Sequence, residues 1–259
     1  MYDIRQVPRF KMNTSSTLLL IGSGRLATHL KHWFNLLSPE NTKLTSWSKS
    51  MAQTELSQLT KSATHIWLAI SDDQINSFYE HQLKKYLHNP QQIVVHFSGS
   101  VFHEEIFCAH PLMTFSTENY SLQAYNKIQF ALFDQKINLS DLMPGFTNPC
   151  FQILPEHKEL YHALCVATGN LPQLIWSQTF SIAKNINIPV SALHAYIETI
   201  THNFSTLGSK AVTGPLVRED LKTIAANLES LEKKSLSLHS IYKSFIPSHL
   251  KNLLKKDLL

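Results

Sequence analysis

The sequence has no apolar run long enough to cross a membrane, so a membrane-spanning protein is not expected. It contains only three cysteines, Cys108, Cys150 and Cys165, and none of them forms a CxxC pair. We expect small buried cysteines in a reducing compartment, which favours a cytoplasmic location. Residues 1–17 carry charges and a proline but no apolar centre, so they are not expected to be a secretory signal.

Charge of either sign is also scarce. Charged residues make up 16% of the chain, the formal net charge is +4, and the basic residues are scattered. A nucleic-acid surface needs clustered lysine and arginine. We therefore expect neither a nucleic-acid partner nor a membrane partner.

Common metal-binding and catalytic patterns are missing as well. The 14 histidines include no HExxH or Cys/His ligand spacing, so no metal site is predicted. His194 and Glu198 come nearest, one helical turn apart, and exposed or capped side chains explain such a pair. No carboxylate pair, Ser-His-Asp set or exposed cysteine nucleophile is recognisable, which argues against hydrolase chemistry.

The sequence does have the means to build a large core. Hydrophobic residues make up 43% of the 259 positions. Short apolar runs alternate with helical periods in the first part of the chain, a pattern typical of a doubly wound parallel sheet. The expected strands cover residues 17–21, 43–47, 64–70, 91–97, 129–133 and 151–154.

The pattern changes near Pro155. Beyond it, apolar residues recur only at helical spacing, as Leu193 and Ile197 do. The sequence therefore predicts an α/β protein with a Rossmann-like doubly wound parallel sheet in residues 1–154 and an all-helical C-terminal domain in residues 155–259. Because no flexible linker separates them, we expect an interdomain cleft that holds a small-molecule substrate. The long, weakly charged helices also favour a homodimer formed through the helical domain.

The strongest motif follows the first expected strand. The segment GSGRLA, residues 22–27, has the GxGxxA pattern that opens a dinucleotide-binding unit. Its first glycine permits a tight turn, its second lets the backbone approach a pyrophosphate, and the following helix presents its positive end. Glycine pairs also form ordinary turns. The expected cofactor contacts are Gly22, Ser23, Gly24, Arg25 and Leu26.

The end of the second expected strand bears on the choice of cofactor. NAD-binding proteins place an acidic residue there for the ribose 2′-hydroxyl, whereas this chain has Trp47-Ser48-Lys49. Ser48 and Lys49, with Arg25 in the glycine turn, suit a 2′-phosphate, so NADP is favoured over NAD. The alternative is that Ser48 and Lys49 form only a polar turn.

Two further strand ends carry small polar residues. Ile70 and Ser71 follow one expected strand, and Ser98 and Gly99 follow the next. We expect all four beside the bound cofactor, with the Ser98 hydroxyl near the nicotinamide ribose. The alternative is a helix cap at the first position and a simple turn at the second, and both roles can coexist.

His110 is a candidate for proton transfer. It precedes Pro111, which keeps it out of helical geometry. A histidine on a loop near the carboxyl edge of the sheet suits a proton donor or a group that orients a carbonyl. Alternatively, its ring locks the loop through backbone hydrogen bonds.

The helical half supplies the other candidate catalytic residues, Asn170, Thr213 and Arg218. Residues 213–215 are typical of a turn whose proline opens a helix, with Arg218 in its first turns. Arg218 would grip an anionic substrate with its guanidinium fork, or instead pair with Asp220. Asn170 and Thr213 are neutral polar groups suited to line the same cleft.

These segments together resemble a known family: Rossmann-like NADP-dependent oxidoreductases with a helical C-terminal domain of unknown function, distant relatives of pyrroline-carboxylate and ketopantoate reductases. This chain departs from the family at Gly169, where a serine is usual, and at Pro172, which is expected to kink the helix and change the aim of Asn170. The resemblance rests on GSGRLA (22–27), AISDDQI (69–75), VVHFSGS (94–100), HPLMTF (110–115), LYHALCVATGN (160–170), HNFSTLG (202–208) and TGPLVRED (213–220).

The residues and the resemblance predict an NADP-dependent oxidoreductase that transfers a hydride between the cofactor and a small, anionic substrate in the interdomain cleft. The alternative is a sensor or regulatory protein that binds NADP without turnover. A proton-transfer group near the nicotinamide, such as His110, distinguishes the enzyme from the sensor.

Overall fold

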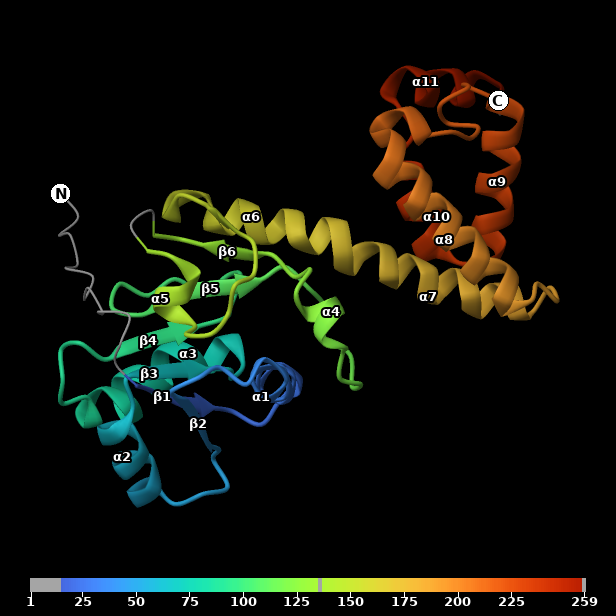
Figure 1. The fold of residues 1–259 in the computed structure, drawn as a ribbon. Helices are drawn as coiled ribbons and strands as arrows, with labels where there is room; N and C mark the ends of the chain where they lie inside the picture. The colour runs from blue at the N-terminus through green and yellow to red at the C-terminus, as the bar shows by residue number, and fades with distance from the viewer. Residues whose placement is uncertain (1–14, 135–136, 258–259) are drawn as a thin grey trace. The chain divides into compact units, whose positions relative to one another are not determined.

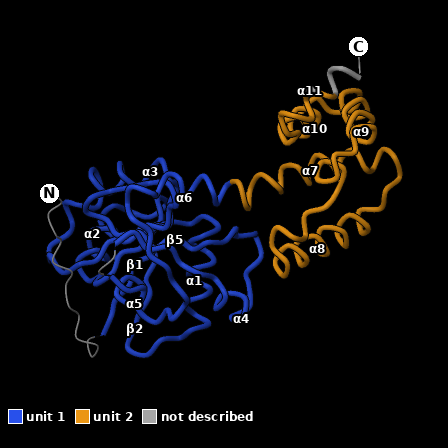
Figure 2. The backbone as a smooth tube through the Cα atoms, turned by 90° about the horizontal axis from the view of Figure 1, so that it is seen from above, with its two compact units in different colours: residues 1–166 blue, residues 167–259 orange. Residues whose placement is uncertain are grey.

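A computed structural model describes residues 15–134 and 137–257 of the chain. No secretory signal is expected in residues 1–17. Of these, residues 1–14 lie outside the described residues. Contacts divide the chain into two compact units, Met1–Val166 and Ala167–Leu259 (Figure 2). We call them unit 1 and unit 2 and describe each by itself.

Unit 1 is built on a seven-stranded sheet in the order β2-β1-β3-β4-β5-β6-β7 (Figure 1). Neighbouring strands are parallel except for β5 and β6, which pair antiparallel. The expected α/β class is therefore confirmed, with one antiparallel junction that the sequence did not indicate. The strands are β1 (Ser16–Ile21), β2 (Thr42–Trp47), β3 (His65–Leu68), β4 (Ile93–His96), β5 (Phe107–Pro111), β6 (Phe130–Leu132) and β7 (Cys150–Gln152).

Helices cover both faces of this sheet (Figure 1). Because side chains alternate along a strand, β1 sends Leu18 and Leu20 into one core and Leu19 and Ile21 into the other. This division explains why β1, β3 and β4 are apolar along most of their length. The helices of unit 1 are α1 (Arg25–Leu37), α2 (Gln53–Ser62), α3 (Asp72–Phe78), α4 (Leu122–Tyr125), α5 (Leu139–Leu142) and α6 (Lys158–Cys165), with short turns η1 (Tyr79–Leu83), η2 (Lys84–Tyr86) and η3 (Pro155–His157).

Unit 2 is all-helical, as the sequence predicts. Its small buried core consists of Ile224, Ile246 and Leu250. The helix α8 buries none of its residues, and α7 buries only Ala183. The elements are the last part of η4 (Val166–Asn170), then α7 (Leu171–Lys184), α8 (Val190–Leu207), η5 (Gly208–Ala211), α9 (Leu221–Lys234), α10 (Leu236–Ser244) and α11 (Ser248–Asp257). None of the helices in the described ranges is long and apolar enough to cross a bilayer.

The division between the units falls later than the expected domain boundary after Leu154. The last strand does end near that point, but the chain remains with unit 1 until Val166. Lys158 and Tyr161 of α6 explain this, because their side chains bond to Cys108 and His110 of β5.

The three cysteines are free thiols. Cys150 is exposed, so the expectation that all three are small buried residues is wrong for this position. It lies on β7, the edge strand of the sheet, whereas Cys108 and Cys165 are partly covered.

Candidate functional site

The glycine turn lies where the strand order of the sheet reverses. From β1 the chain continues to β2 on one side, and β3 then pairs on the other side of β1. In open α/β sheets this reversal leaves a crevice beyond the carboxyl ends of the strands, where ligands bind. Gly22 follows β1 there, and Ala69 follows β3.

Gly22 is required by the packing of the turn. Its N–H donates to the Trp47 carbonyl at 2.9 Å, and its φ is +134°, a value that favours glycine. A Cβ at this position would stand 2.1 Å from the Ala69 carbonyl oxygen. The turn can therefore pass against the end of β3 only without a side chain.

Gly24 has the opposite surroundings. It precedes α1, its φ is an ordinary −76°, and a Cβ built on it meets no atom within 4 Å. Ser23, Gly24 and Arg25 are exposed beside the first free N–H groups of α1, a helix of 13 residues. This open space above a helix N-terminus fits the pyrophosphate of a dinucleotide.

A cavity of about 270 Å³ adjoins the turn between α1 and β2. It contains three of the predicted contacts, Gly22, Ser23 and Ser48, whereas Lys49 is exposed and does not line it. Its one charged lining residue is Lys31, and no carboxylate lines it. The full lining is Leu20, Gly22, Ser23, Ala27, Thr28, Lys31, Ser46, Trp47, Ser48 and Met51.

The other predicted cofactor contacts lie along the same sheet edge. Leu26 is partly buried on the first turn of α1, and Ile70 packs near Gly22. Ser71 precedes α3, but its side chain makes no capping hydrogen bond there. The Ser98 hydroxyl accepts from the N–H groups of Ser100 and Val101, so it holds its own turn. A contact from Ser98 to a ribose remains a prediction.

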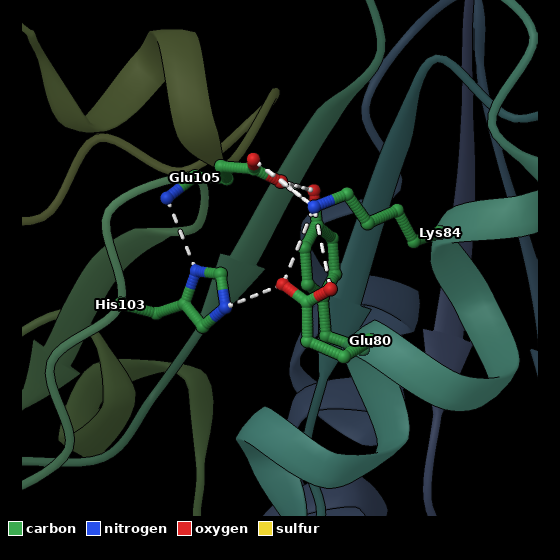
Figure 3. A network of polar contacts seen from close by, with 5 residues as sticks. Glu80, Lys84, His103 and Glu105 are labelled. Atoms are coloured by element: carbon green, nitrogen blue, oxygen red, sulfur yellow. Dashed lines mark hydrogen bonds and ion pairs between the residues drawn. The ribbon is translucent and has the colours of Figure 1, made fainter.

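The segment after Gly99 is tied to the α3 side of the sheet by an ionic network (Figure 3). Lys84 binds Glu105 at 2.8 Å and Glu80 at 3.3 Å, and His103 contacts Glu80 at 3.3 Å. The Glu105 N–H donates to His103 Nδ1 at 3.1 Å. These contacts hold the loop that follows Gly99 against η1 and η2.

His110 lies on β5, so the expectation of a loop is wrong. Pro111 excludes a helix but suits an extended strand end, where it pairs with Phe130 of β6. A Cβ on Gly99 would stand 3.0 Å from His110 Nε2 and 2.8 Å from His162 Cδ2. Gly99 is thus needed because two imidazole rings lie against its backbone.

The His110 ring is held neutral by its surroundings. Burial lowers its pKa to about 4, and the Lys158 ammonium and His162 act in the same direction, whereas Asp72 opposes them. Burial and Lys158 likewise lower the pKa of His96 to about 3. At neutral pH both rings are therefore uncharged.

Lys158 and Tyr161 of α6 belong to this site, and the sequence did not single them out. Lys158 is 3% exposed, and its Nζ donates to the Ser98 carbonyl at 3.2 Å and to Cys108 Sγ at 3.0 Å. It also lies 3.6 Å from the centroid of the Phe133 ring. Burial raises the pKa of the Cys108 thiol. Tyr161 hydrogen-bonds His110 Nδ1 at 2.7 Å.

The candidate residues of unit 2 are exposed. Among the described residues, no side-chain hydrogen bond joins Asn170, Thr213 and Arg218. The prediction that Pro215 opens a helix is wrong, because α9 begins at Leu221 and the Asp220 carboxylate caps it by accepting from the Thr223 N–H. The catalytic roles of these residues remain predictions.

Pro172 lies in the first turn of α7, where the missing N–H costs little. The irregular segment precedes it as the π-helical turn η4, Val166–Asn170, and Gln173 Nε2 donates to the Gly169 carbonyl at 2.9 Å. The departure from a regular helix thus falls before the proline. In the described part of the chain, no group of three His, Cys, Asp or Glu side chains is arranged to hold a metal ion.

The sheet order, the glycine turn and the helical C-terminal region define the class: a Rossmann-like dinucleotide-binding fold with a helical second domain. Residues 135–246 match the family model described as "Domain of unknown function (DUF2520)". A search of curated proteins gives no match.

Solved structures share this fold. A candidate NADP oxidoreductase from Bacteroides fragilis is 17% identical, with 93% of this chain and 98% of that chain covered and a TM-score of 0.69. Protein TM1727 from Thermotoga maritima is 18% identical, with 93% and 100% covered and a TM-score of 0.63. An NADH-preferring ketol-acid reductoisomerase from an uncultured archaeon is 10% identical, with 94% and 83% covered and a TM-score of 0.54. These likenesses show the fold, and the DUF2520 match covers the C-terminal region that the resemblance assigned to a domain of unknown function.

Proposed function

We propose that the protein is an NADP-dependent oxidoreductase that transfers a hydride between the cofactor and a small, anionic substrate. The observation that carries the proposal is the cavity beside Gly22 and Ser23, whose polar side chains are hydroxyl groups and Lys31, with no carboxylate. A 2′-phosphate needs cations and hydrogen-bond donors at this place, whereas NAD needs an acid. The structural relatives include a candidate NADP oxidoreductase, which supports the same cofactor class.

Different residues along the sheet edge bind different parts of the cofactor and the substrate. The N-terminal turn of α1 after Gly24 binds the pyrophosphate, and Ser48 and Lys31 receive the adenosine end. When bound, NADPH supplies the hydride. His110 beside Gly99 contacts the substrate, and the buried Lys158 gives this end of the site a positive potential that favours an anion.

A titration tests the cofactor assignment. We expect NADPH to bind at least tenfold more tightly than NADH, because one desolvated phosphate contact contributes about 1.4 kcal/mol or more. Nicotinamide fluorescence measures both affinities, and consumption of NADPH is then screened against small oxo acids. Equal affinities would contradict the NADP preference, and tight binding without turnover across the screen would favour the sensor.

The two lysines near the cavity make separate predictions. Lys31→Ala is expected to weaken NADPH binding by about tenfold and to leave NADH binding unchanged, because Lys31 is the lining cation. Lys49→Ala is the matched variant, for which we expect a smaller loss, since Lys49 is exposed outside the lining. A larger loss of NADPH affinity in Lys49→Ala than in Lys31→Ala would show that Lys49, as the sequence suggests, contacts the 2′-phosphate.

We also propose that unit 2 forms a homodimer with a second copy of the chain. Tyr196 and Phe204 of α8 are 64% and 55% exposed, and α8 buries none of its 18 residues within the chain. A helix gains most of its stability from packing an apolar face, and a self-complementary apolar surface is the usual basis of a homodimer.

Light scattering after size exclusion tests the dimer. The 29.5 kDa chain is expected to elute at twice its mass. Phe204→Glu should convert it to a monomer, because the charge would be buried in the interface. Lys234→Glu, on the exposed end of α9, is the control that should remain dimeric. A monomeric parent protein would contradict the proposal.

A further inference from the structure

The proposed function gives no role to the hydrogen bond between Tyr161 and His110. Tyr161 lies on α6 and His110 on β5, and both belong to unit 1. The Tyr161 hydroxyl and His110 Nδ1 are 2.7 Å apart, and the two rings meet edge to face with centroids 5.5 Å apart. The contact is short enough to fix the orientation of the imidazole, and the proton position then depends on which partner donates.

In this contact either the hydroxyl donates to a bare Nδ1 or a protonated Nδ1 donates to the hydroxyl oxygen. Burial raises the pKa of Tyr161, so its oxygen keeps the proton. The Cys165 side chain lies beside the same hydroxyl. An imidazole nitrogen is a better acceptor than a thiol sulfur, and a thiol is itself a weak donor. The favoured arrangement therefore directs the Tyr161 proton to His110 Nδ1.

The other nitrogen of the ring must then carry the proton. A neutral imidazole has one N–H, and when Nδ1 accepts, Nε2 is the donor. This Nε2 faces the backbone of Gly99, and no described residue makes a hydrogen bond to it. In this arrangement the Nε2–H has no hydrogen-bond partner among the described residues.

We propose that Tyr161 is a positioning residue that keeps the His110 proton on Nε2, and that the site therefore offers a neutral donor to the oxygen of a carbonyl substrate. This inference rests on the proposed oxidoreductase function. It narrows the substrate to ketones and aldehydes, as opposed to imines.

The charges around His110 support this choice. The cationic Lys158 and the ring of His162 lie on α6, His96 on β4 is neutral, and Asp72 at the start of α3 is the acidic group that acts on His110. Asp72 Oδ2 already accepts from the Ser100 hydroxyl at 2.8 Å. A protonated imine would bring a second cation near Lys158 and would have no lone pair for the Nε2–H.

A carbonyl oxygen can accept a hydrogen bond from the His110 Nε2–H before and after hydride transfer. As the hydride bonds to carbon, the π electron pair of the C=O bond moves to oxygen. The Nε2–H stabilises this growing negative charge by hydrogen bonding, as neutral donors do in oxyanion sites. Water then supplies the proton that converts the alkoxide to the alcohol, leaving hydroxide in solvent.

Nitrogen NMR of histidine-labelled protein tests the proton position without any cofactor. At pH 7 the His110 signals, assigned by their loss in His110→Gln, are expected to show a protonated Nε2 and a bare Nδ1. In Tyr161→Phe the two tautomers should be mixed, because the donor to Nδ1 is gone. A protonated Nδ1 in the parent protein would overturn the proposal whether or not the variant folds.

A paired substrate screen tests the chemical class. With NADPH, oxo acids are expected to be reduced at least tenfold faster than cyclic imines of similar size, and Tyr161→Phe should lower kcat for the carbonyl about tenfold with unchanged NADPH affinity. Faster imine reduction would overturn the substrate class. Absence of NADPH binding would contradict the proposed function, while the tautomer would still be measured in the cofactor-free protein.

Discussion

Gly22→Ala is expected to destabilise unit 1 strongly and to lower its midpoint of thermal unfolding. The new Cβ would stand 2.1 Å from the Ala69 carbonyl oxygen and 2.8 Å from its carbon, and the residue would have to hold a φ of +134°. The clash is with backbone, so it cannot be relieved by turning a side chain. Separating the turn from β3 would break the packing between two central strands. We expect a loss of roughly 3 kcal/mol or more, out of the 5–15 kcal/mol typical of a domain.

Gly24→Ala is the matched control two residues away. Its φ of −76° suits any residue and its Cβ would meet nothing within 4 Å, so the midpoint of thermal unfolding should stay close to that of the parent protein. The same methyl group would point into the space proposed for the pyrophosphate, so NADPH affinity should fall by about tenfold or more.

Thermal unfolding and NADPH titration of both variants separate the two roles. Gly22→Ala with an unchanged melting temperature would show that the turn is not packed as the structure has it. Gly24→Ala with unchanged NADPH affinity would place the pyrophosphate elsewhere. The pair thus distinguishes a glycine needed for folding from a glycine needed for the cofactor.

The clearest of the predicted strands have an uninterrupted apolar run, such as Leu18–Ile21 and Ile93–Val95, because both faces of a central parallel strand are buried. The strand β5 was missed because FCAHP mixes polar residues with a proline. Its extended form depends on pairing with β4 and β6, which are distant in sequence, so local pattern carries little of the signal.

The site divides in the same way. The turn at Gly22 is recognisable because its conformation is set by adjacent residues, whereas Lys158 reaches Ser98 across 60 positions of the chain. A lysine early in a helix is ordinarily an exposed residue, and nothing local marks this one as buried. Tyr161 is part of the LYHA motif, but the sequence does not indicate that its hydroxyl contacts His110. That contact depends on how α6 packs against β5. Lys31 was missed because the fingerprint directs attention to the end of β2.

The unfolding free energy is expected to fall steeply as the pH drops from 6.5 towards 4. His65, His96 and His110 have their pKa lowered from 6.5 to about 4, 3 and 4, in each case mainly by burial. A ring with a lowered pKa in the folded state takes up its proton only on unfolding in this range. Stability is therefore fully present above pH 6.5 and is lost as acid protonates the unfolded chain.

The expected size of this loss is large. A shift from 6.5 to about 4 corresponds to about 3 kcal/mol for one ring, and the three rings together to something on the order of 10 kcal/mol. That is comparable to the whole stability of a typical domain, so we expect acid unfolding of unit 1 between pH 6.5 and 4. Denaturant titrations at a series of pH values give the unfolding free energy as a function of pH. Its slope should approach an uptake of three protons on unfolding.

Single variants assign the slope to particular rings. His65 is 2% exposed and contacts the Asp141 carbonyl at 3.1 Å, so His65→Gln keeps a polar group there while removing the titration. We expect this variant to be less stable at pH 8 but to lose about one proton from the slope below pH 6.5. His81→Gln, at an exposed position of η1, is the control and should leave the slope unchanged. A slope that His65→Gln does not alter would mean that His65 is already protonated in the folded protein, or that groups other than the buried histidines drive acid unfolding.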